Sequence, residues 1–454
     1  MKYPPPILRR LFVLLLLAVP VSTLATPSLP PPRFYIETIE VEGARRVTPE
    51  ILLSEALLAE RTEYGEAELR DAIHRLLRLP FILEARFALE KGSERGKLQL
   101  IIEVEEVHRF FFGADLETSF SARDFSFERS FPNDQNTQLF TLAGMRFFPG
   151  RHSVGFVSIS DGAVQAGFTR YGLGKSGTFL SLGYERQACC QIQVEPLGID
   201  PTFSSWSSGN DSDRGTLALG FYLDRQRSLR FEISYQESHR GDRLPVLEEP
   251  GLFTRFEYDD RRTLRLEAAW IHDTTDDSTF PTRGESLAAT LEFHDLEADF
   301  EMPGQVLDFS QPVLVLPLGV EMRSRMLRGV VTGTRHWPQG RSTFSAGLRL
   351  AAGRSEIRNL PTRDGIIPEA ELDVWEARLD LRHLFRIYRS SLAEKHRELF
   401  WETRASLGYE STSPDLGLLN DSLDRLTFST GLAYRTSWGI FRLGLTYLDF
   451  GRTT

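Results

Sequence analysis

The sequence predicts a small α+β domain followed by an antiparallel transmembrane β-barrel, for which we expect sixteen strands. Two composition regimes lead to this fold class. Over residues 34–107 the apolar residues recur with helical and strand periods, whereas over 108–454 they alternate with polar ones. Alternation places one set of side chains on each face of a strand, so the long second part is predicted to be all-β.

Composition narrows the class of protein before any motif is considered. The chain has 454 residues, with 53 Lys and Arg against 63 Asp and Glu, for a formal net charge of −10. This balance argues against a broad nucleic-acid-binding surface. The 2 Cys cannot form a disulfide-rich scaffold or a four-cysteine zinc site.

Residues 1–25 have the pattern of a secretory signal peptide. A basic start precedes an apolar run, and Ala25 offers a small residue at the cleavage point. A membrane anchor is the alternative, but Pro20 interrupts the run, which is too short to span a bilayer. We expect a Pro-rich, extended linker over 26–33.

Residues 34–107 have the pattern of a compact α+β domain. A strand comes first, and two helices follow it, one from Pro49 and one over about 66–79. Proline is favoured at the first helical position, and apolar stripes mark the buried helix faces. Two strands, over 82–89 and 98–104, complete the order strand–helix–helix–strand–strand.

This order of elements resembles a POTRA domain, the periplasmic module that precedes certain outer-membrane barrels. The Val-Glu-Gly after the first strand and the closing Glu-Val-Glu at 103–105 fit the resemblance. The alternative is any other small α+β domain, because no single residue is diagnostic. The resemblance implies a periplasmic domain whose sheet edge binds extended polypeptide segments.

Over 108–454 a period of two dominates. In 372–383, for example, apolar residues such as Trp375 and Leu379 alternate with charged ones. A soluble β-sandwich would also alternate. The charged residues on the polar face, the segment length of often about ten residues and the leader favour a membrane barrel with a wet interior. Similar segments are 215–223, 229–235, 287–293, 342–350, 401–409 and 441–447.

The expected strand number comes from these segments. About fifteen of them occur between residues 109 and 450, and single-chain bacterial barrels generally have an even number of strands. We therefore expect a sixteenth, poorly marked strand between Pro303 and Met322. The barrel must close between its first and last strands, and a weakly paired junction there would be able to open. The candidate residues of this junction are Phe110, Gly113, Phe441, Gly444 and Phe450.

A second resemblance lies before the strand that contains Leu287. The segment resembles the "D…D…FPTRG" hairpin of the outer-membrane assembly and secretion superfamily of the bacterial surface antigen type. That superfamily includes barrel-assembly proteins, two-partner secretion transporters and patatin-linked autotransporters. A tight reversal needs Pro and Gly, and Asp side chains cap free N–H groups. A calcium site is the alternative, but the spacing does not match an EF-hand. The residues are Asp273, Asp276, Phe280, Pro281, Thr282, Arg283 and Gly284.

The superfamily also carries a Val/Ile-Arg-Gly-Phe/Tyr motif in a loop that folds into the barrel interior. Residues 357–360, Ile-Arg-Asn-Leu, keep the arginine but lack the glycine and the aromatic residue. The resemblance implies that Arg358 binds acidic groups on the barrel wall. An ordinary loop arginine is the alternative. Residues 327–330, Leu-Arg-Gly-Val, are closer in spelling but lie inside an apparent strand.

The sequence predicts no enzyme, no cofactor and no metal site. The 9 His are scattered, and the chain has no H-E-x-x-H, no G-x-S-x-G and no phosphate-binding loop. Cys189 and Cys190 are adjacent, a spacing that forms a disulfide only with strain, and their redox state stays open.

The two resemblances together imply a barrel in the bacterial outer membrane that assists insertion of outer-membrane proteins or translocates a polypeptide. The implied partners are the lipid bilayer, unfolded outer-membrane or secreted polypeptide clients, and periplasmic accessory proteins, with no nucleic acid. A passive, porin-like channel and a surface-interaction barrel remain as alternatives. A channel would conduct ions and tolerate deletion of 34–107.

Overall fold

The computed structural model describes most of the two predicted domains. The predicted signal peptide, nearly all of the predicted linker, and Cys189 and Cys190 lie outside the described residues. The described ranges are 32–121, 137–150, 152–160, 162–173, 177–187, 210–240, 258–277, 279–302, 318–362, 365–390, 397–412 and 425–450.

The N-terminal domain is a four-stranded sheet with two helices. The predicted helices and the three predicted strands are present. A fourth, short strand lies between the two helices in the chain and pairs with the first strand. The sheet order is β2-β1-β4-β3, with β1 and β4 parallel and the other pairs antiparallel. The elements are β1 (Arg33–Glu42), α2 (Pro49–Ala56), β2 (Thr62–Gly65), α3 (Glu66–Leu77), β3 (Ile82–Lys91) and β4 (Lys97–Glu106).

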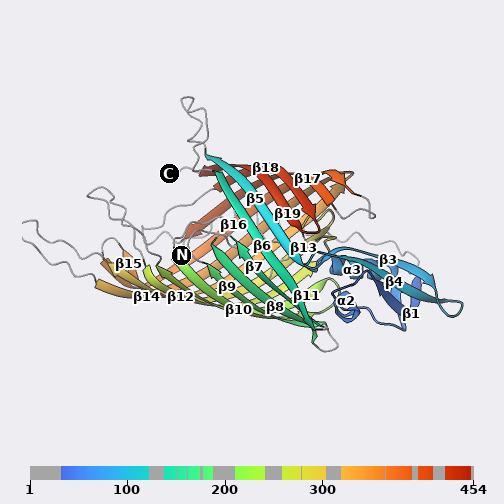
Figure 1. The fold of residues 1–454 in the computed structure, drawn as a ribbon. Helices are drawn as coiled ribbons and strands as arrows, with labels where there is room; N and C mark the ends of the chain where they lie inside the picture. Colours follow the sequence, from blue (N-terminus) through green and yellow to red (C-terminus); the bar gives the residue numbers. More distant parts are fainter. Residues whose placement is uncertain are drawn as a thin grey trace, which may run out of the picture.

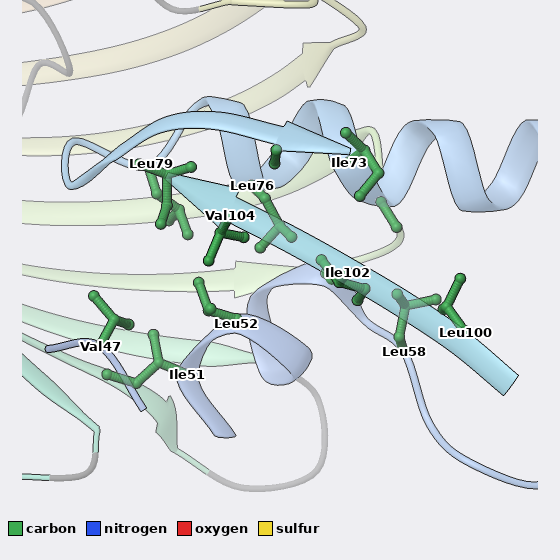
Figure 2. Close-up of a cluster of buried hydrophobic side chains, with 14 of the residues drawn as sticks. Val47, Ile51, Leu52, Leu58, Ile73, Leu76, Leu79, Leu100, Ile102 and Val104 are labelled. Carbon is green, nitrogen blue, oxygen red and sulfur yellow. The ribbon is translucent and has the colours of Figure 1, made fainter. Parts of the chain in front are cut away.

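Local signals explain where the helices begin and end. Pro49 opens α2, and Leu57 closes it in the left-handed region with φ 53°. At the start of α3, the backbone N–H of Gly65 donates to Glu68 Oε2 at 2.6 Å. The apolar stripes of both helices pack on one face of the sheet and form the core shown in Figure 2, where Leu52, Leu76 and Ile102 meet.

Fifteen strands form a closed barrel after this domain. Figure 1 shows the N-terminal domain, in blue, against one end of the barrel, here called the near end. The strands are β5 (Phe110–Ser121), β6 (Thr137–Gly150), β7 (Ser153–Ser160), β8 (Ala163–Leu173), β9 (Thr178–Gln187), β10 (Asn210–Tyr222), β11 (Arg227–Arg240), β12 (Tyr258–Asp273), β13 (Gly284–Met302), β14 (Leu318–Gln339), β15 (Ser342–Thr362), β16 (Gly365–Arg389), β17 (Arg397–Thr412), β18 (Arg425–Thr436) and β19 (Gly439–Phe450).

The prediction of sixteen strands is wrong. In the region expected to hold the extra strand, β14 begins at Leu318, and residues 303–317 lie outside the described residues. Neighbouring strands along the chain are antiparallel, so an odd strand number makes the first and last strands parallel. The barrel therefore closes through a parallel ladder between β19 and β5, here called the seam.

The alternation in the sequence separates side chains that face the barrel interior from side chains on its outer surface. Large apolar side chains are exposed on the outer surface, for example Trp375 at 51% and Leu291 at 54%, while Glu292 and Glu402 lie buried on the inner side. Apolar outside and polar inside is the arrangement of a barrel surrounded by lipid. At the near end the strands join through short turns, such as 223–226 between β10 and β11.

Candidate functional site: the near end of the barrel

The predicted hairpin segment joins β12 to β13 at the near end, over residues 274–283 (the 274–283 loop). Its aspartates accept hydrogen bonds from the loop backbone. Asp276 Oδ1 accepts from the N–H of Thr282 at 2.8 Å, and its Oδ2 accepts from the hydroxyl of the same residue at 2.5 Å. Asp277 Oδ1 accepts from the N–H of Phe280 at 3.0 Å. These carboxylates shape the loop from within.

The two ends of the loop are also fixed by local geometry. Asp273 Oδ1 accepts from the N–H of Thr275 at 2.8 Å. Gly284 has φ +97°, and a Cβ there would lie 2.3 Å from the carbonyl oxygen of Thr274, so only glycine fits without a shift. The other predicted loop residues are Pro281, which is buried, and Arg283, which is exposed.

Phe280 carries the loop into the barrel interior. Its side chain is 2% exposed and stacks on Phe400 of β17, with ring centroids 4.5 Å apart. Leu384 of β16 and Ala433 of β18 complete this apolar cluster. Because β16 to β18 do not pair with β12 or β13, the loop crosses part of the near-end opening.

An ion pair fixes the loop on the same side. Arg435 of β18 places Nη1 2.5 Å from Asp277 Oδ2, and the side chains are 9% and 18% exposed. The same nitrogen lies 3.8 Å from Glu398 Oε2 on β17. Burial of these two charges costs desolvation free energy, which their mutual attraction offsets. Loss of one partner would therefore leave the other charge buried and uncompensated. Sequence reasoning missed Arg435, because nothing local marks it as the partner of a residue 158 positions earlier.

Arg358 does not occupy the interior position that the resemblance implies. It lies in β15, opposite Arg323 on β14 and Glu369 on β16. Counting alternate residues along β15, its side chain shares the outward face with Phe344, which is 46% exposed. The expected interior loop arginine is therefore not found at Arg358, because the strand simply continues through this segment.

Arg328 belongs to residues 327–330, which match the Val/Ile-Arg-Gly-Phe/Tyr motif more closely, and its side chain lies on the inner side of β14. Its Nη2 is 3.1 Å from Glu292 Oε2, and its Nη1 is 3.6 Å from Glu376 Oε2. Arg265 also forms an ion pair with Glu292, with 3.2 Å between Nη2 and Oε1. These ion pairs belong to the wall of the barrel, and they line its interior with alternating charges.

The N-terminal domain binds the root of the 274–283 loop. Arg78, directly after α3, places Nη1 3.0 Å from Asp273 Oδ2 and donates to the carbonyl oxygen of Asp273 at 2.6 Å. The side chain of Arg78 is 12% exposed. One arginine thus joins the domain to the last residue of β12, next to the loop that enters the barrel.

A buried cluster forms a second contact between domain and barrel. Tyr222, at the end of β10, donates its hydroxyl to Glu55 Oε2 of α2 at 2.7 Å. Arg75 of α3 lies over the Tyr222 ring, 3.8 Å from its centroid, and donates to the Glu55 carbonyl oxygen at 2.5 Å. Burial raises the pKa of Glu55 to about 7, although Arg75 and the Tyr222 hydroxyl oppose the shift.

The turn between β10 and β11 and an apolar contact extend this interface. Arg225 donates to the carbonyl oxygen of Leu57 at 2.9 Å, and Gln226 donates to Asp71 Oδ2 at 2.9 Å. Phe81 of the domain packs edge-on against Tyr171 of β8, with ring centroids 5.8 Å apart. The core of the domain is therefore continuous with the inner wall of the barrel.

The seam begins beside this interface. The backbone N–H of His108 donates to Ser437 in the β18–β19 turn at 2.8 Å, and that of Phe112 donates to Trp438 at 2.9 Å. The rings of His108 and Trp438 stack with centroids 3.7 Å apart. Gly439 approaches so closely that a Cβ there would lie 1.8 Å from the Phe112 oxygen.

Beyond this contact the ladder runs from Phe441 opposite Ala114 to Leu448 opposite Ser121. Of the predicted seam residues, Phe110 and Phe441 point outward, Gly113 lies near the Ile440 backbone and Gly444 faces Gly431 on the other side of β19. Phe450 pairs with Arg425 of β18. A parallel ladder is slightly less stable per residue than an antiparallel one. The predicted weakness of the seam stays a prediction.

A small cavity of about 80 Å³ lies where the three parts meet. The domain contributes Leu79 and Ile82, the loop contributes Thr279, and Trp438 of the β18–β19 turn and Ile440 of β19 complete the lining on the barrel side. Within the described ranges, no group of three or more His, Cys, Asp or Glu is placed to hold a metal ion. The helices of the described part are also too short or too polar to cross a membrane.

Comparisons with known proteins find low similarity. No family model matches the chain, and no curated protein matches it. BamA from Haemophilus ducreyi lacking POTRA domains 1–3 has a TM-score of 0.40 at 14% identity, covering 93% of this chain and 82% of that one. The siderophore receptor PiuA from Acinetobacter baumannii has a TM-score of 0.32 at 10% identity, covering 91% and 71%. The ferric-catecholate import receptor Fiu from E. coli K12, in its open form, has 0.30 at 9%, covering 88% and 70%.

Proposed function

We propose that this protein is an outer-membrane β-barrel that inserts or translocates polypeptide clients, with its N-terminal domain in the periplasm. The proposal rests on the contacts that connect the N-terminal domain, the 274–283 loop and β18 at the near end. Arg78 connects the domain to Asp273, and Arg435 connects Asp277 to β18. The turn that follows β18 contacts the first barrel strand. A displacement of the domain would therefore reach both the loop and the seam.

Two features support this orientation and the handling of clients. Short turns lie at the end that carries the N-terminal domain, as on the periplasmic side of outer-membrane barrels. In the domain, the ten-residue strand β3 lies at the edge of the sheet. An edge strand can bind an extended segment by main-chain hydrogen bonds that depend little on the client's sequence. β3 begins at Ile82, which also lines the cavity beside the seam.

A passive channel is the second candidate, and the charged wall of the interior favours it. Ion pairs such as those of Arg328 and Arg265 with Glu292 suit a water-filled passage. The 274–283 loop opposes this function, because Phe280 and the Arg435–Asp277 pair hold it across part of the opening. Ion conductance of the unaltered protein is therefore expected to be low.

The test measures client binding and client folding with the full chain in liposomes. A photo-crosslinking residue replaces Ala88, which is exposed on β3. The matched control replaces Gln99, a half-buried residue on β4, which is an inner strand paired at this position with β1 on one side and β3 on the other. We expect an unfolded outer-membrane barrel client to crosslink at position 88 and not at 99, and to fold faster in the presence of this protein.

Either of two results would contradict the proposal. Equal crosslinking at both positions would indicate nonspecific adhesion of the client to the domain. High conductance in planar bilayers, together with no acceleration of client folding, would favour the passive channel. Crosslinking of a secreted client at position 88, without faster folding of the barrel client, would support translocation as the function in place of barrel insertion.

A further inference from the structure

An apolar groove of about 510 Å³ crosses the outer surface of the barrel between β9 and β14. It is centred on β11 and β12, and β12 lies opposite the seam in the order of the fifteen strands. The groove is lined by outward-facing apolar side chains, such as Leu266 and Leu291. Glu232 and Glu267 also border it, but their side chains belong to the inner face, where they are 8% and 15% exposed.

Side-chain size explains why the wall is hollow here. Ala268 of β12 stands between Phe231 of β11 and Leu291 of β13, and Leu291 in turn faces Gly329 of β14. The two small residues leave space between larger neighbours. The adjacent row, which contains Leu266 between Ile233 and Phe293, forms one wall. The groove therefore runs across the strands.

The shape of the groove selects among occupants. Strands lie about 4.8 Å apart, so the distance from β9 to β14 is about 24 Å. An α-helix of that length and about 10 Å in diameter would occupy roughly 1,900 Å³, nearly four times the volume of the groove. A peptide in extended form would leave its backbone groups without hydrogen-bond partners on this apolar surface. A single hydrocarbon chain meets neither obstacle.

We propose that this groove binds one acyl chain of a membrane lipid on the wall opposite the seam. The groove is continuous with the apolar surface that the barrel presents to the bilayer, so lipid chains reach it without crossing a polar region. The inference rests on the part of the proposed function that places the barrel in a membrane. It does not depend on whether the protein handles clients.

The test measures lipid retained by the full-length protein in detergent. The probe is palmitoyl-oleoyl phosphatidylethanolamine, added at increasing ratio and counted by native mass spectrometry. Ala268→Trp fills the floor of the groove. Ala405→Trp is the matched control, because Ala405 is also an outward alanine between two large residues, Leu381 and Phe428, but lies outside the groove.

We expect the natural protein and Ala405→Trp to retain one lipid and Ala268→Trp to bind it at least ten times more weakly. If Ala268→Trp fails to fold, Ala268→Leu is used, with Ala405→Leu as its control. Equal retention by both variants, or no retention by the natural protein, would overturn the proposal. Retention of a second protein chain in place of lipid would overturn it as well, and would assign the groove to a contact between copies. Failure here alone leaves client crosslinking at position 88 unaffected.

Discussion

Arg435 of β18 and Asp277 of the 274–283 loop form an ion pair with 2.5 Å between Nη1 and Oδ2, across residues that no sheet pairing connects. The pair keeps the loop against the opposite part of the wall. It also places a charge-assisted hydrogen bond two residues before the turn that leads into the last strand. The position of the loop and the position of the seam are therefore linked through one side chain.

Arg435→Ala is expected to release the 274–283 loop from β18. The substitution leaves Asp277 largely buried without its cation, and loss of one partner of a buried pair typically costs about 3 kcal/mol or more. Single-channel conductance in planar bilayers should rise relative to the natural protein. Arg283→Ala is the control, because the Arg283 side chain is 62% exposed and its ion pair with Asp276 is a surface pair. Equal conductance of both variants would show that the pair does not restrict the opening.

Phe280→Ala is expected to loosen the same loop through packing. The side chain is 2% exposed and stacks on Phe400, and replacing such a phenylalanine with alanine costs about 3–5 kcal/mol. A cysteine at Thr279, which is 8% exposed, reports the change by its rate of maleimide labelling in a chain with Cys189 and Cys190 replaced by serine. Labelling should accelerate at least tenfold.

The control for this substitution is Phe428→Ala, which removes an outward phenylalanine that is 44% exposed. Its effect on labelling at position 279 should be small, because it leaves the interior cluster intact. Unchanged labelling in Phe280→Ala would contradict the assignment of this ring as the anchor of the loop.

Gly439→Ala is expected to open the near end of the seam. The new Cβ would lie 1.8 Å from the carbonyl oxygen of Phe112, a distance that requires the β18–β19 turn to move away from β5. A cysteine pair at positions 114 and 441, opposite one another in the ladder, measures closure by disulfide formation. The yield should fall several-fold.

Gly340→Ala is the matched control for the seam. Gly340 also has a positive φ, +65°, and lies in a near-end turn, but nothing surrounds its Cβ position within 4 Å. Its strain stays local, at about 1 kcal/mol. Equal loss of disulfide yield in both variants would show that the close approach of Gly439 does not hold the seam.

Docking of the N-terminal domain is expected to weaken as the pH rises. The pKa of Glu55 is about 7 in the folded protein against an ordinary value of 4.5, so the folded state retains a proton between these values. The corresponding stability is fully present below pH 4.5 and is lost as the pH rises through 7. Its upper limit is about 3 kcal/mol. Hydrogen exchange in α2 should be slower at pH 5 than at pH 8.

Glu55→Gln tests this assignment, because glutamine keeps an oxygen that accepts from Tyr222 and does not titrate. The difference in exchange between pH 5 and pH 8, corrected for the intrinsic rate, should shrink in this variant. Glu90→Gln, at an exposed position on β3, should retain the pH dependence of the natural protein. A pH dependence that persists in Glu55→Gln would assign the effect to another group.

Sequence patterns predicted the features that depend on neighbours along the chain. Pro49 marked the start of α2, and alternation in 372–383 correctly separated outward Trp375 from inward residues such as Glu376. The loop aspartates accept hydrogen bonds from N–H groups a few residues away, so their chemistry is also local. The number of strands does not depend on neighbours along the chain, and the prediction of sixteen strands was wrong.

The interior arginine shows why resemblance alone was insufficient. Arg358 matched only part of a motif, and its position in β15 gives it the outward parity, which alternation sets one residue at a time. Arg435 had no motif, yet the inward parity of β18 directs it to Asp277. A one-residue difference in parity decides whether a side chain meets lipid or the barrel interior.

Periodicity and turn chemistry in the chain were enough to predict the helices and most strand positions, because these depend on contacts within a few residues. Closure of the barrel decided the rest. It made the seam parallel, and it brought Arg435 to Asp277 and Arg78 to Asp273, pairs that lie 158 and 195 residues apart. Such pairs depend on the registers of many successive strands, and no local pattern carries that information.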